Sequence, residues 1–380
     1  MSLAHSPSIV TNGLVMCYDM ANTGRSFKGA PTTNYVDNAT AMTSWGNYSS
    51  GTPVQFMTEF GTMGYRMDWL GSWNGVVRGV TIPSPGVYTF SAWIKWIGGS
   101  TNVTGGAVYI SGWGGGDSAT ATNQTLPGQW QRISITLNCT NTSMTFYLID
   151  WGGTYGADNS SWQVTMPQVE AGSFATPFVD GTRSNTQALI DLAGNNTLTT
   201  NSLTYASDNT FSFNGTSDYI SCGNFGAFYS QGTISFWMNS ATLSNYPNPF
   251  HTHFQGGNAG IRFEESVSGN NFGVVIGNDA GSYSAHVYMT TSMTANTWYH
   301  VTLTWNTSSN IATGYLNGVQ VFNEAQTLWA TTMPSVTIGN GFNNVRFWNG
   351  KINAVQIYNR ALTAAEVAQN FNALRGRYGI

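Results

Sequence analysis

The sequence predicts an all-β protein made of two β-sandwich jelly rolls and one short C-terminal helix. Its length of 380 residues suggests about two domains. The chain contains 44 glycines and is 14% aromatic but only 8% charged, a composition typical of aromatic-rich strands joined by many turns. Several segments also alternate apolar and polar residues with a period of two, which indicates strands that bury one face.

The clearest alternating segment runs from Trp298 to Phe322. Apolar and polar side chains alternate between Tyr299 and Trp305, which predicts a half-buried strand. A second apolar run ends at Leu316, and Asn317-Gly318 connects it to a third. Because Asn-Gly supplies the two positive-φ positions of a tight turn, we expect a β-hairpin here.

Strands are also predicted nearer the N-terminus. The apolar stretch that begins at Gly13 predicts one isolated strand, which needs a sheet formed by other parts of the chain. Three further alternating segments, 87–96, 130–137 and 144–151, are separated by clusters of Gly, Ser, Thr and Asn. Many short strands separated by turns are typical of a β-sandwich.

One helix is expected near the C-terminus. Thr363 and Glu366 have the spacing of a capping box, and Phe371 and Leu374 follow at helical spacing. The helix should end near Gly376, and we expect its apolar side to close over a sandwich edge.

Motifs in the C-terminal half resemble the laminin-G-like (concanavalin A-like) jelly roll. They are Phe213-Asn-Gly-Thr-Ser-Asp-Tyr-Ile, Ile234-Ser-Phe-Trp, Trp298-Tyr-His-Val with Trp305, Tyr315-x-Asn-Gly, Asn349-Gly-Lys-Ile and Ile357-Tyr-Asn-Arg-Ala-Leu. Proteins of this type often open with a Gly-Leu-Val-x-x-x-Asp segment, soon followed by an Asp-x-x-Gly-Asn segment.

Here the first of these two segments starts at Gly13 and the second only at Asp191. The resemblance therefore implies that residues 1–28 and 184–380 form one discontinuous jelly roll, with residues 29–183 inserted as a second domain. Domain insertion is tolerated where two chain ends lie close together at a surface. The alternative is an N-terminal arm that precedes two tandem domains.

The inserted segment resembles the carbohydrate-binding-module-like jelly rolls of bacteriophage tail and fibre proteins. The resemblance is carried by an aromatic strand, Gly128-Gln-Trp, Phe146-Tyr-Leu and the closing phrase Pro167-Gln-Val-Glu-Ala-Gly-Ser-Phe-Ala-Thr-Pro-Phe. It implies a virion surface protein, either an adhesin-like tail or fibre component that binds host glycans or a capsid or tail decoration protein. A polysaccharide depolymerase is a third alternative. Expected partners are other virion proteins, further copies of the chain and a host surface glycan.

Composition argues against several other functions. The formal net charge is −4 and the 13 Lys and Arg residues form no cluster, so we expect neither nucleic-acid binding nor attraction to an anionic membrane. No run approaches the ~20 apolar residues of a membrane-spanning helix, and Met1 to Val10 lacks the pattern of a signal peptide. Synthesis in a host cytoplasm and assembly into a virion are therefore expected. Cys17, Cys139 and Cys222 have unrelated spacings and are expected to be buried free thiols.

No catalytic constellation is evident, and we expect a protein that is not an enzyme. Glycosidases need two carboxylates across a sugar, and the Glu-x-Asp-x-x-Glu strand that marks glycosidases of the concanavalin A-like fold is absent. Glu264 and Glu265 are adjacent in a strand, so their side chains should point to opposite faces. His251 and His253 could form a metal pair, although loop or surface histidines are the simpler interpretation.

Binding surfaces are a better prediction, because aromatic rings stack on sugars and are enriched at interfaces. The candidates for glycan binding or for an interface are Trp73, Trp113, Trp151, Tyr155, Trp162, Tyr246 and Trp329. No cofactor is required. Calcium is conceivable at Asp218 or Glu170, where a turn residue and a buried acceptor are the respective alternatives.

Overall fold

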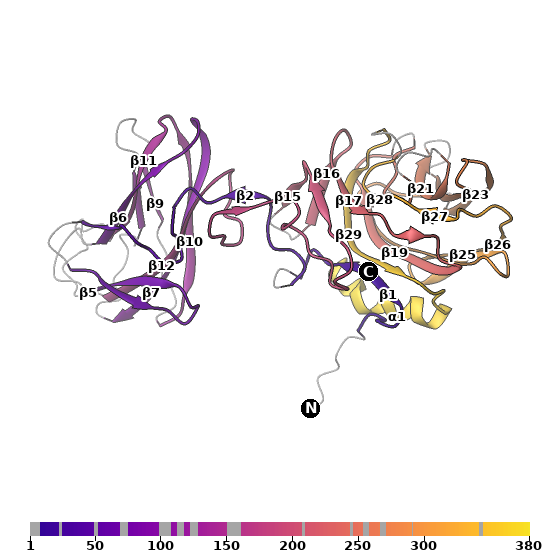
Figure 1. Ribbon diagram of the computed structural model, residues 1–380, viewed down its shortest axis with the longest axis horizontal. Coiled ribbons are helices and arrows are strands. Elements are labelled where there is room, and N and C mark those ends of the chain that lie inside the picture. Colours follow the sequence, from indigo (N-terminus) through magenta and orange to yellow (C-terminus); the bar gives the residue numbers. More distant parts are fainter. Residues whose placement is uncertain are drawn as a thin grey trace, which may run out of the picture. The chain divides into compact units, whose positions relative to one another are not determined.

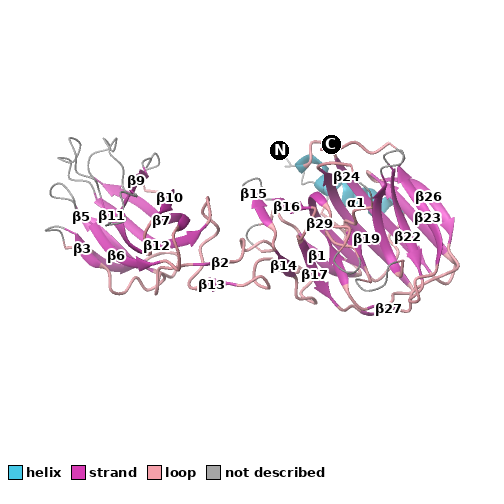
Figure 2. Cartoon of the chain, turned by 90° about the horizontal axis from the view of Figure 1, so that it is seen from above, coloured by secondary structure: helices cyan, strands magenta, loops and turns pink. Residues whose placement is uncertain are grey.

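A computed structural model gives the fold of the chain (Figures 1 and 2). It describes residues 8–22, 25–48, 52–68, 75–98, 108–111, 118–121, 128–149, 161–206, 210–243, 246–253, 258–266, 271–290, 292–341 and 345–380. The chain forms two compact units: unit 1 comprises Met1–Ala30 and Ser184–Ile380, and unit 2 comprises Pro31–Arg183. The boundaries expected from the sequence were 1–28 with 184–380, and 29–183.

Unit 1 contains two large antiparallel sheets in its described part. The strands are β1 (Leu14–Tyr18), β14 (Thr199–Asn201), β15 (Thr204–Ala206), β16 (Thr210–Asn214), β17 (Tyr219–Gly223), β19 (Gln231–Ser240), β20 (Phe250–His251), β21 (Gly260–Ser266), β22 (Asn271–Gly277), β23 (Tyr283–Thr290), β24 (Trp298–Asn306), β25 (Ile311–Leu316), β26 (Val319–Ala325), β28 (Val336–Ile338) and β29 (Asn349–Tyr358). An eight-stranded sheet has the order β15-β16-β29-β19-β24-β25-β26, and β1 pairs with β29 as well; a seven-stranded sheet has the order β14-β17-β28-β20-β21-β22-β23. The short strands β18 (Gly226–Ala227) and β27 (Thr332–Met333) form a separate pair.

Unit 2 is a smaller sandwich of two five-stranded sheets, counted over its described residues. Its strands are β2 (Thr32–Thr33), β3 (Gly46–Tyr48), β4 (Val54–Met57), β5 (Met63–Asp68), β6 (Gly75–Thr81), β7 (Gly86–Gly98), β8 (Val108–Ser111), β9 (Ser118–Ala121), β10 (Gln131–Cys139), β11 (Ser143–Ile149), β12 (Ser161–Ala171) and β13 (Thr182–Arg183). The sheet orders are β10-β7-β12-β5-β4 and β3-β6-β11-β8-β9, while β2 pairs with β13 where the chain enters and leaves the unit. The sequence prediction of an all-β protein with sandwiches is confirmed.

Aromatic side chains join the two sheets inside each unit. In unit 1, Phe236 of β19 stacks on Phe250 of β20 at 6.0 Å and meets Phe263 of β21 edge-on at 5.0 Å. In unit 2, Phe90 of β7 meets Phe146 of β11 edge-on at 5.6 Å. Such ring pairs add to the free energy gained from apolar burial. The core of each unit therefore lies between its own two sheets.

The hairpin predicted around Asn317 is confirmed. Asn317 and Gly318 have φ of 50° and 78°, and they join β25 to β26 as the Asn-Gly rule requires. Strand β24, however, is buried on both faces, where the sequence predicted a half-buried strand. Val301 and Leu303 face the core between the sheets, whereas His300 on the other face is fully buried under aromatic rings.

A helix is responsible for this second layer of burial. Helix α1 (Ala364–Leu374) has the predicted capping box at Thr363 and Glu366, and the short 3-10 turn η2 (Arg375–Arg377) follows it. Phe371 of α1 stacks on Trp237 of β19 at 5.7 Å and lies 5.7 Å from the His300 ring. The helix thus covers the outer face of the eight-stranded sheet, not the edge expected from the sequence.

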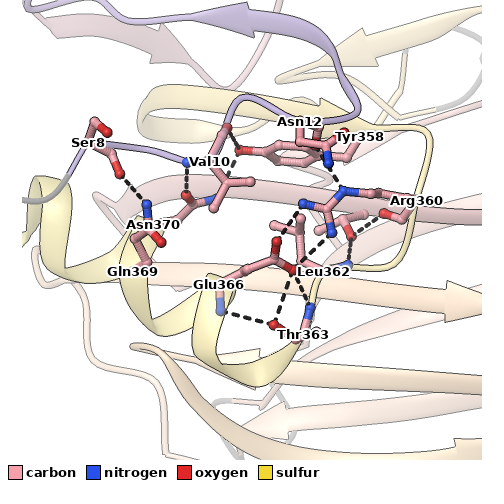
Figure 3. A network of polar contacts seen from close by, with 11 residues as sticks. Ser8, Val10, Asn12, Tyr358, Arg360, Leu362, Thr363, Glu366, Gln369 and Asn370 are labelled. Carbon is pink, nitrogen blue, oxygen red and sulfur yellow. Dashed lines mark hydrogen bonds and ion pairs between the residues drawn. The ribbon is translucent and has the colours of Figure 1, made fainter.

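The N-terminal segment is fixed between this helix and β29, as Figure 3 shows. Val10 donates its N–H to Asn370 Oδ1 at 2.8 Å and accepts a hydrogen bond from the Tyr358 hydroxyl at 2.9 Å. Arg360 donates to the Asn12 carbonyl at 3.0 Å. These bonds join residues more than 340 positions apart, so the start of the chain is an integral part of unit 1.

Two further predictions concern the whole chain. Cys17, Cys139 and Cys222 are all buried and free, as predicted. Within the described residues, no helix combines the length and apolar character that crossing a bilayer would need.

Candidate functional site

The outer face of the seven-stranded sheet carries an unusual concentration of polar side chains. In the register of this sheet, Arg262 lies opposite His251 on one side and Val275 on the other, and Val275 lies opposite His286. Alternation places the neighbouring residues of these strands in the apolar core. Polar side chains from three strands, β20, β21 and β23, are therefore brought together on one sheet face.

At the centre of this face, one buried carboxylate holds two guanidinium groups. Glu264 Oε2 accepts from Arg262 Nε at 3.1 Å and Nη2 at 2.9 Å, and from Arg346 Nη1 at 3.0 Å. Glu264 Oε1 lies 3.4 Å from His286 Nε2. The Arg262 and Glu264 side chains are only 5% and 4% exposed, so their interaction is screened little by water.

Two exposed tyrosines flank the buried charges. The Arg346 guanidinium lies 5.1 Å from the centre of the Tyr246 ring, and the His286 ring lies 4.7 Å from that of Tyr288. Tyr246 and Tyr288 are 44% and 43% exposed. We call the set Tyr246, Arg262, Glu264, His286, Tyr288 and Arg346 the tyrosine–arginine face; its contacts run without a break from one tyrosine to the other.

The backbone is strained at the two loop residues that complete this face. Tyr246 and Arg346 have φ of 63° and 61°, a region that bulky residues rarely adopt and that costs of order 1–3 kcal/mol. Each conformation is held by backbone hydrogen bonds, from Tyr246 N–H to the Glu265 carbonyl at 3.1 Å and from Asn248 N–H to the Arg346 carbonyl at 2.8 Å. Strain held in this way is characteristic of residues positioned for binding.

A glycine leaves room for the contact between the Glu264 carboxylate and the His286 imidazole. Gly273 lies between Glu264 and Tyr288 in the register. A Cβ at this position would lie 2.5 Å from the Val287 carbonyl oxygen and 3.2 Å from His286 Nε2. A side chain there would displace the β23 backbone at Val287 and crowd the His286 imidazole.

The histidines do not occupy the loop or surface positions expected from the sequence. His251 is fully buried and its Nε2 lies 3.1 Å from the Ala259 carbonyl oxygen, while His253 Nε2 lies 3.2 Å from Asp279. They have separate partners, and no group of three His, Cys, Asp or Glu side chains suited to a metal occurs in the described part of the chain.

Burial of histidines predicts acid sensitivity of unit 1. Burial lowers the pKa of His251 and of His300 to about 3. Unfolded histidine binds a proton near pH 6.5, so the unfolded state binds more protons and unit 1 loses stability as the pH falls below that value. We expect its melting temperature to fall between pH 7 and pH 5, above the range where most carboxylates titrate, and to fall less steeply in His300→Gln. An equal slope in that variant would contradict this assignment.

The candidate aromatic residues predicted from the sequence have different outcomes. Trp73, Trp113, Trp151 and Tyr155 lie outside the described residues. Trp162 was wrong as a binding candidate: it is 3% exposed within the core of unit 2. Trp329 is half-buried, packs on Phe228 and donates to Asn310 at 3.2 Å, so most of its ring is in the fold. Tyr246 belongs to the tyrosine–arginine face.

The two calcium candidates have surroundings that do not suit the ion. Glu170 accepts from Thr176 N–H, the Thr176 hydroxyl and Gln168, and its nearest charged neighbours are cations. It fastens the closing phrase of unit 2 to β12. Asp218 accepts from Asn214 N–H and the Ser217 hydroxyl, as a turn residue does, and burial raises its pKa. Neither residue is therefore assigned to calcium.

Unit 2 also has an aromatic cluster on one sheet surface. Phe60 lies 5.7 Å from Trp93 and 5.5 Å from Trp130, and Lys95 Nζ lies 5.6 Å from the Trp130 ring and 3.1 Å from Glu59. Phe60 is 44% exposed. Strand β7 presents Trp93 and Lys95 on the side opposite its buried apolar residues. We call Phe60, Trp93 and Trp130 the three-ring face.

Sequence reasoning missed Arg262, His286, Tyr288, Arg346 and the three-ring face. A signal was present for the first: Arg262 and Glu264 interrupt an apolar strand in a chain that is only 8% charged. Charged residues rarely occupy such positions without a partner. No local pattern indicates Arg346, because it reaches the site from a loop 82 positions away from Glu264.

Comparison with known proteins supports the fold of unit 1. Residues 213–368 match the family model of the concanavalin A-like lectin/glucanases superfamily. No curated protein matches the chain. That segment of unit 1 is thus a concanavalin A-like jelly roll.

Several solved structures are similar to part of the chain. The binding domain of Paraclostridial Mosquitocidal Protein 1 has 22% identity and a TM-score of 0.40, covering 49% of each chain. The binding domain of botulinum neurotoxin serotype D has 17% identity and a TM-score of 0.41, covering 50% of each chain. Domain 4 of an extracellular arabinanase from Geobacillus stearothermophilus, in complex with arabinotriose, has 18% identity and a TM-score of 0.38, covering 49% of this chain and 92% of that one. This chain spans about half the length of the two toxin domains.

Proposed function

We propose that the protein binds glycans through the tyrosine–arginine face and does not cleave them. The observation that carries the proposal is the pair of exposed tyrosines beside the network of buried Arg262 and Glu264 with partly exposed Arg346. Aromatic rings stack on the CH faces of sugars, while fixed charged groups orient their hydroxyls. Glu264 shares its carboxylate with two arginines, which suits a fixed acceptor better than a proton donor.

The proposal also includes the biological location of the protein. We place the protein on a bacteriophage virion as an adhesin-like component that binds host surface glycans. This rests on the resemblance of residues 167–178 to the phrase that closes jelly rolls in virion proteins. In unit 2 that phrase is anchored by hydrogen bonds from the Thr176 N–H and hydroxyl to the Glu170 carboxylate.

A glycan array probed with the full chain tests the proposal, with variants that separate the two faces. Tyr288→Ala should weaken binding about tenfold or more, since a tenfold change corresponds to ~1.4 kcal/mol and a stacked ring contributes about that much. Tyr288→Phe keeps the ring and should bind nearly as the parent does. If Trp93→Ala loses binding and Tyr288→Ala binds as the parent does, the glycan is bound at the three-ring face instead. If the full chain binds no glycan at all, the proposal is rejected. Release of sugar products from host polysaccharide would reject the non-enzymatic part.

Contact with other virion proteins is a second candidate function, favoured by one observation in unit 2. Edge strand β4 exposes Val54 and Met57, which are 58% and 63% exposed. An edge strand has backbone groups ready to pair, and exposed apolar residues favour protein contacts. If β4 forms such a contact, Met57→Glu should abolish assembly or particle incorporation and leave glycan binding unchanged.

A further inference from the structure

The charges of the tyrosine–arginine face do not balance. Two arginines, Arg262 and Arg346, share one carboxylate, that of Glu264. Burial lowers the pKa of His286, although Glu264 opposes this, so the imidazole adds no charge at neutral pH. The face carries one excess positive charge in a chain whose formal net charge is −4.

Among the described residues, no second acidic side chain is seen in contact with the arginines of this face. Glu265 lies on the opposite side of β21, in register with the core residue Phe272. Asp279 is engaged by His253 and Thr331 at the β22–β23 turn. The adjoining segments 244–245, 254–257, 267–270 and 342–344 contain no Asp, Glu, Lys or Arg in the sequence.

Of the two arginines, the one that faces solvent is Arg346, so the excess positive charge lies at the surface. Arg262 is buried and donates to both Glu264 and Asn258, which fixes it within the sheet. Arg346 is 29% exposed and lies against the exposed ring of Tyr246. A guanidinium is planar and binds carboxylates with paired hydrogen bonds, so a ligand stacked on the tyrosine would have its substituents next to this group.

We propose that this face selects glycans whose sugar rings carry a carboxylate, such as uronic or sialic acids. This inference rests on the proposed function and specifies its ligand class. The pyranose ring stacks on Tyr246 or Tyr288, and the carboxylate of the sugar pairs with Arg346 and compensates the excess charge. A neutral sugar can stack on the same rings but leaves that charge uncompensated.

The test compares each acidic oligosaccharide with its carboxyl-reduced form, which keeps the ring and the linkages. Affinity of the full chain is measured by calorimetry for both members of each pair. We expect the acid to bind at least tenfold more tightly than the reduced sugar. In Arg346→Gln this ratio should fall to about one, and in Arg346→Lys, which keeps the charge but not the planar fork, it should be intermediate.

A matched variant distinguishes a local effect from one of overall charge. Arg66→Gln removes the same charge from the exposed Arg66–Asp68 pair of unit 2, and should leave the ratio unchanged. An equal drop in Arg66→Gln, or a parent ratio below twofold, would overturn the inference. Preference for sulfated over carboxylated sugars would also overturn it. Equal binding of acid and reduced forms would leave glycan binding itself intact, whereas binding of neither form would reject the proposed function. The melting temperature of unit 1, measured in each variant, shows that a changed ratio does not reflect unfolding.

Discussion

Deletion of residues 1–28 is expected to abolish the cooperative unfolding transition of unit 1 while leaving that of unit 2. The deleted segment contains β1, which pairs with β29 near the centre of the eight-stranded sheet. Met16, Tyr18 and Met20 are each fully buried in the core of unit 1. Loss of one such large side chain costs about 2–5 kcal/mol, so loss of all three is comparable to the whole stability of a domain, about 5–15 kcal/mol.

Polar contacts add to this effect. Asp191 accepts from the Cys17 N–H at 2.8 Å, and Asn353 from the Met20 N–H at 3.0 Å. These acceptors and Asn370 would lose buried partners. Calorimetry of the full chain and of the deletion variant measures the two transitions. A synthetic peptide of residues 8–28 should restore the transition of unit 1 when added in trans. An unchanged transition after deletion would show that the N-terminal segment is only an arm.

Glu264→Ala is expected to lower the free energy of unfolding of unit 1 by about 3–5 kcal/mol and to abolish glycan binding. The variant leaves the buried guanidinium of Arg262 without the carboxylate that neutralises it, and removal of one partner of a buried ion pair carries a cost of this size. The variant also removes the 3.0 Å hydrogen bond from Arg346 to Glu264 that orients the Arg346 guanidinium in the parent. Chemical denaturation of the full chain measures the change.

A glutamate on the surface of the same unit provides the control. Glu324 lies on β26 and is exposed, so Glu324→Ala removes the same charge and should change stability by about 0.5 kcal/mol or less. If Glu264→Ala is as stable as Glu324→Ala, the network around Glu264 is not the buried ionic site described above.

The strands, the turn and the helix could be predicted from sequence patterns, because each of these patterns involves residues that are close together in the chain. Alternation from Tyr299 to Trp305, the turn at Asn317-Gly318 and the capping box at Thr363 are local signals, and each corresponds to the predicted element. Burial of the second face of β24 was not predictable in the same way. It depends on where helix α1 docks, and that contact joins segments about 70 residues apart.

The candidate site was predicted far less well, for a related physical reason. The tyrosine–arginine face is assembled from β21, β23 and two loops, so its residues have no common spacing in the sequence. The criterion of an aromatic residue in or beside a loop selected Tyr246, which belongs to this face, but it also selected Trp162, which is a core residue. Composition of a loop does not tell which side of a sheet a ring faces.

A crystal structure of the full chain grown with the tightest-binding acidic oligosaccharide tests the central claim most directly. The account predicts a sugar ring stacked on Tyr246 or Tyr288, with its carboxylate within hydrogen-bonding distance of Arg346. A sugar bound at the three-ring face of unit 2, or on any surface away from Arg346, would contradict it.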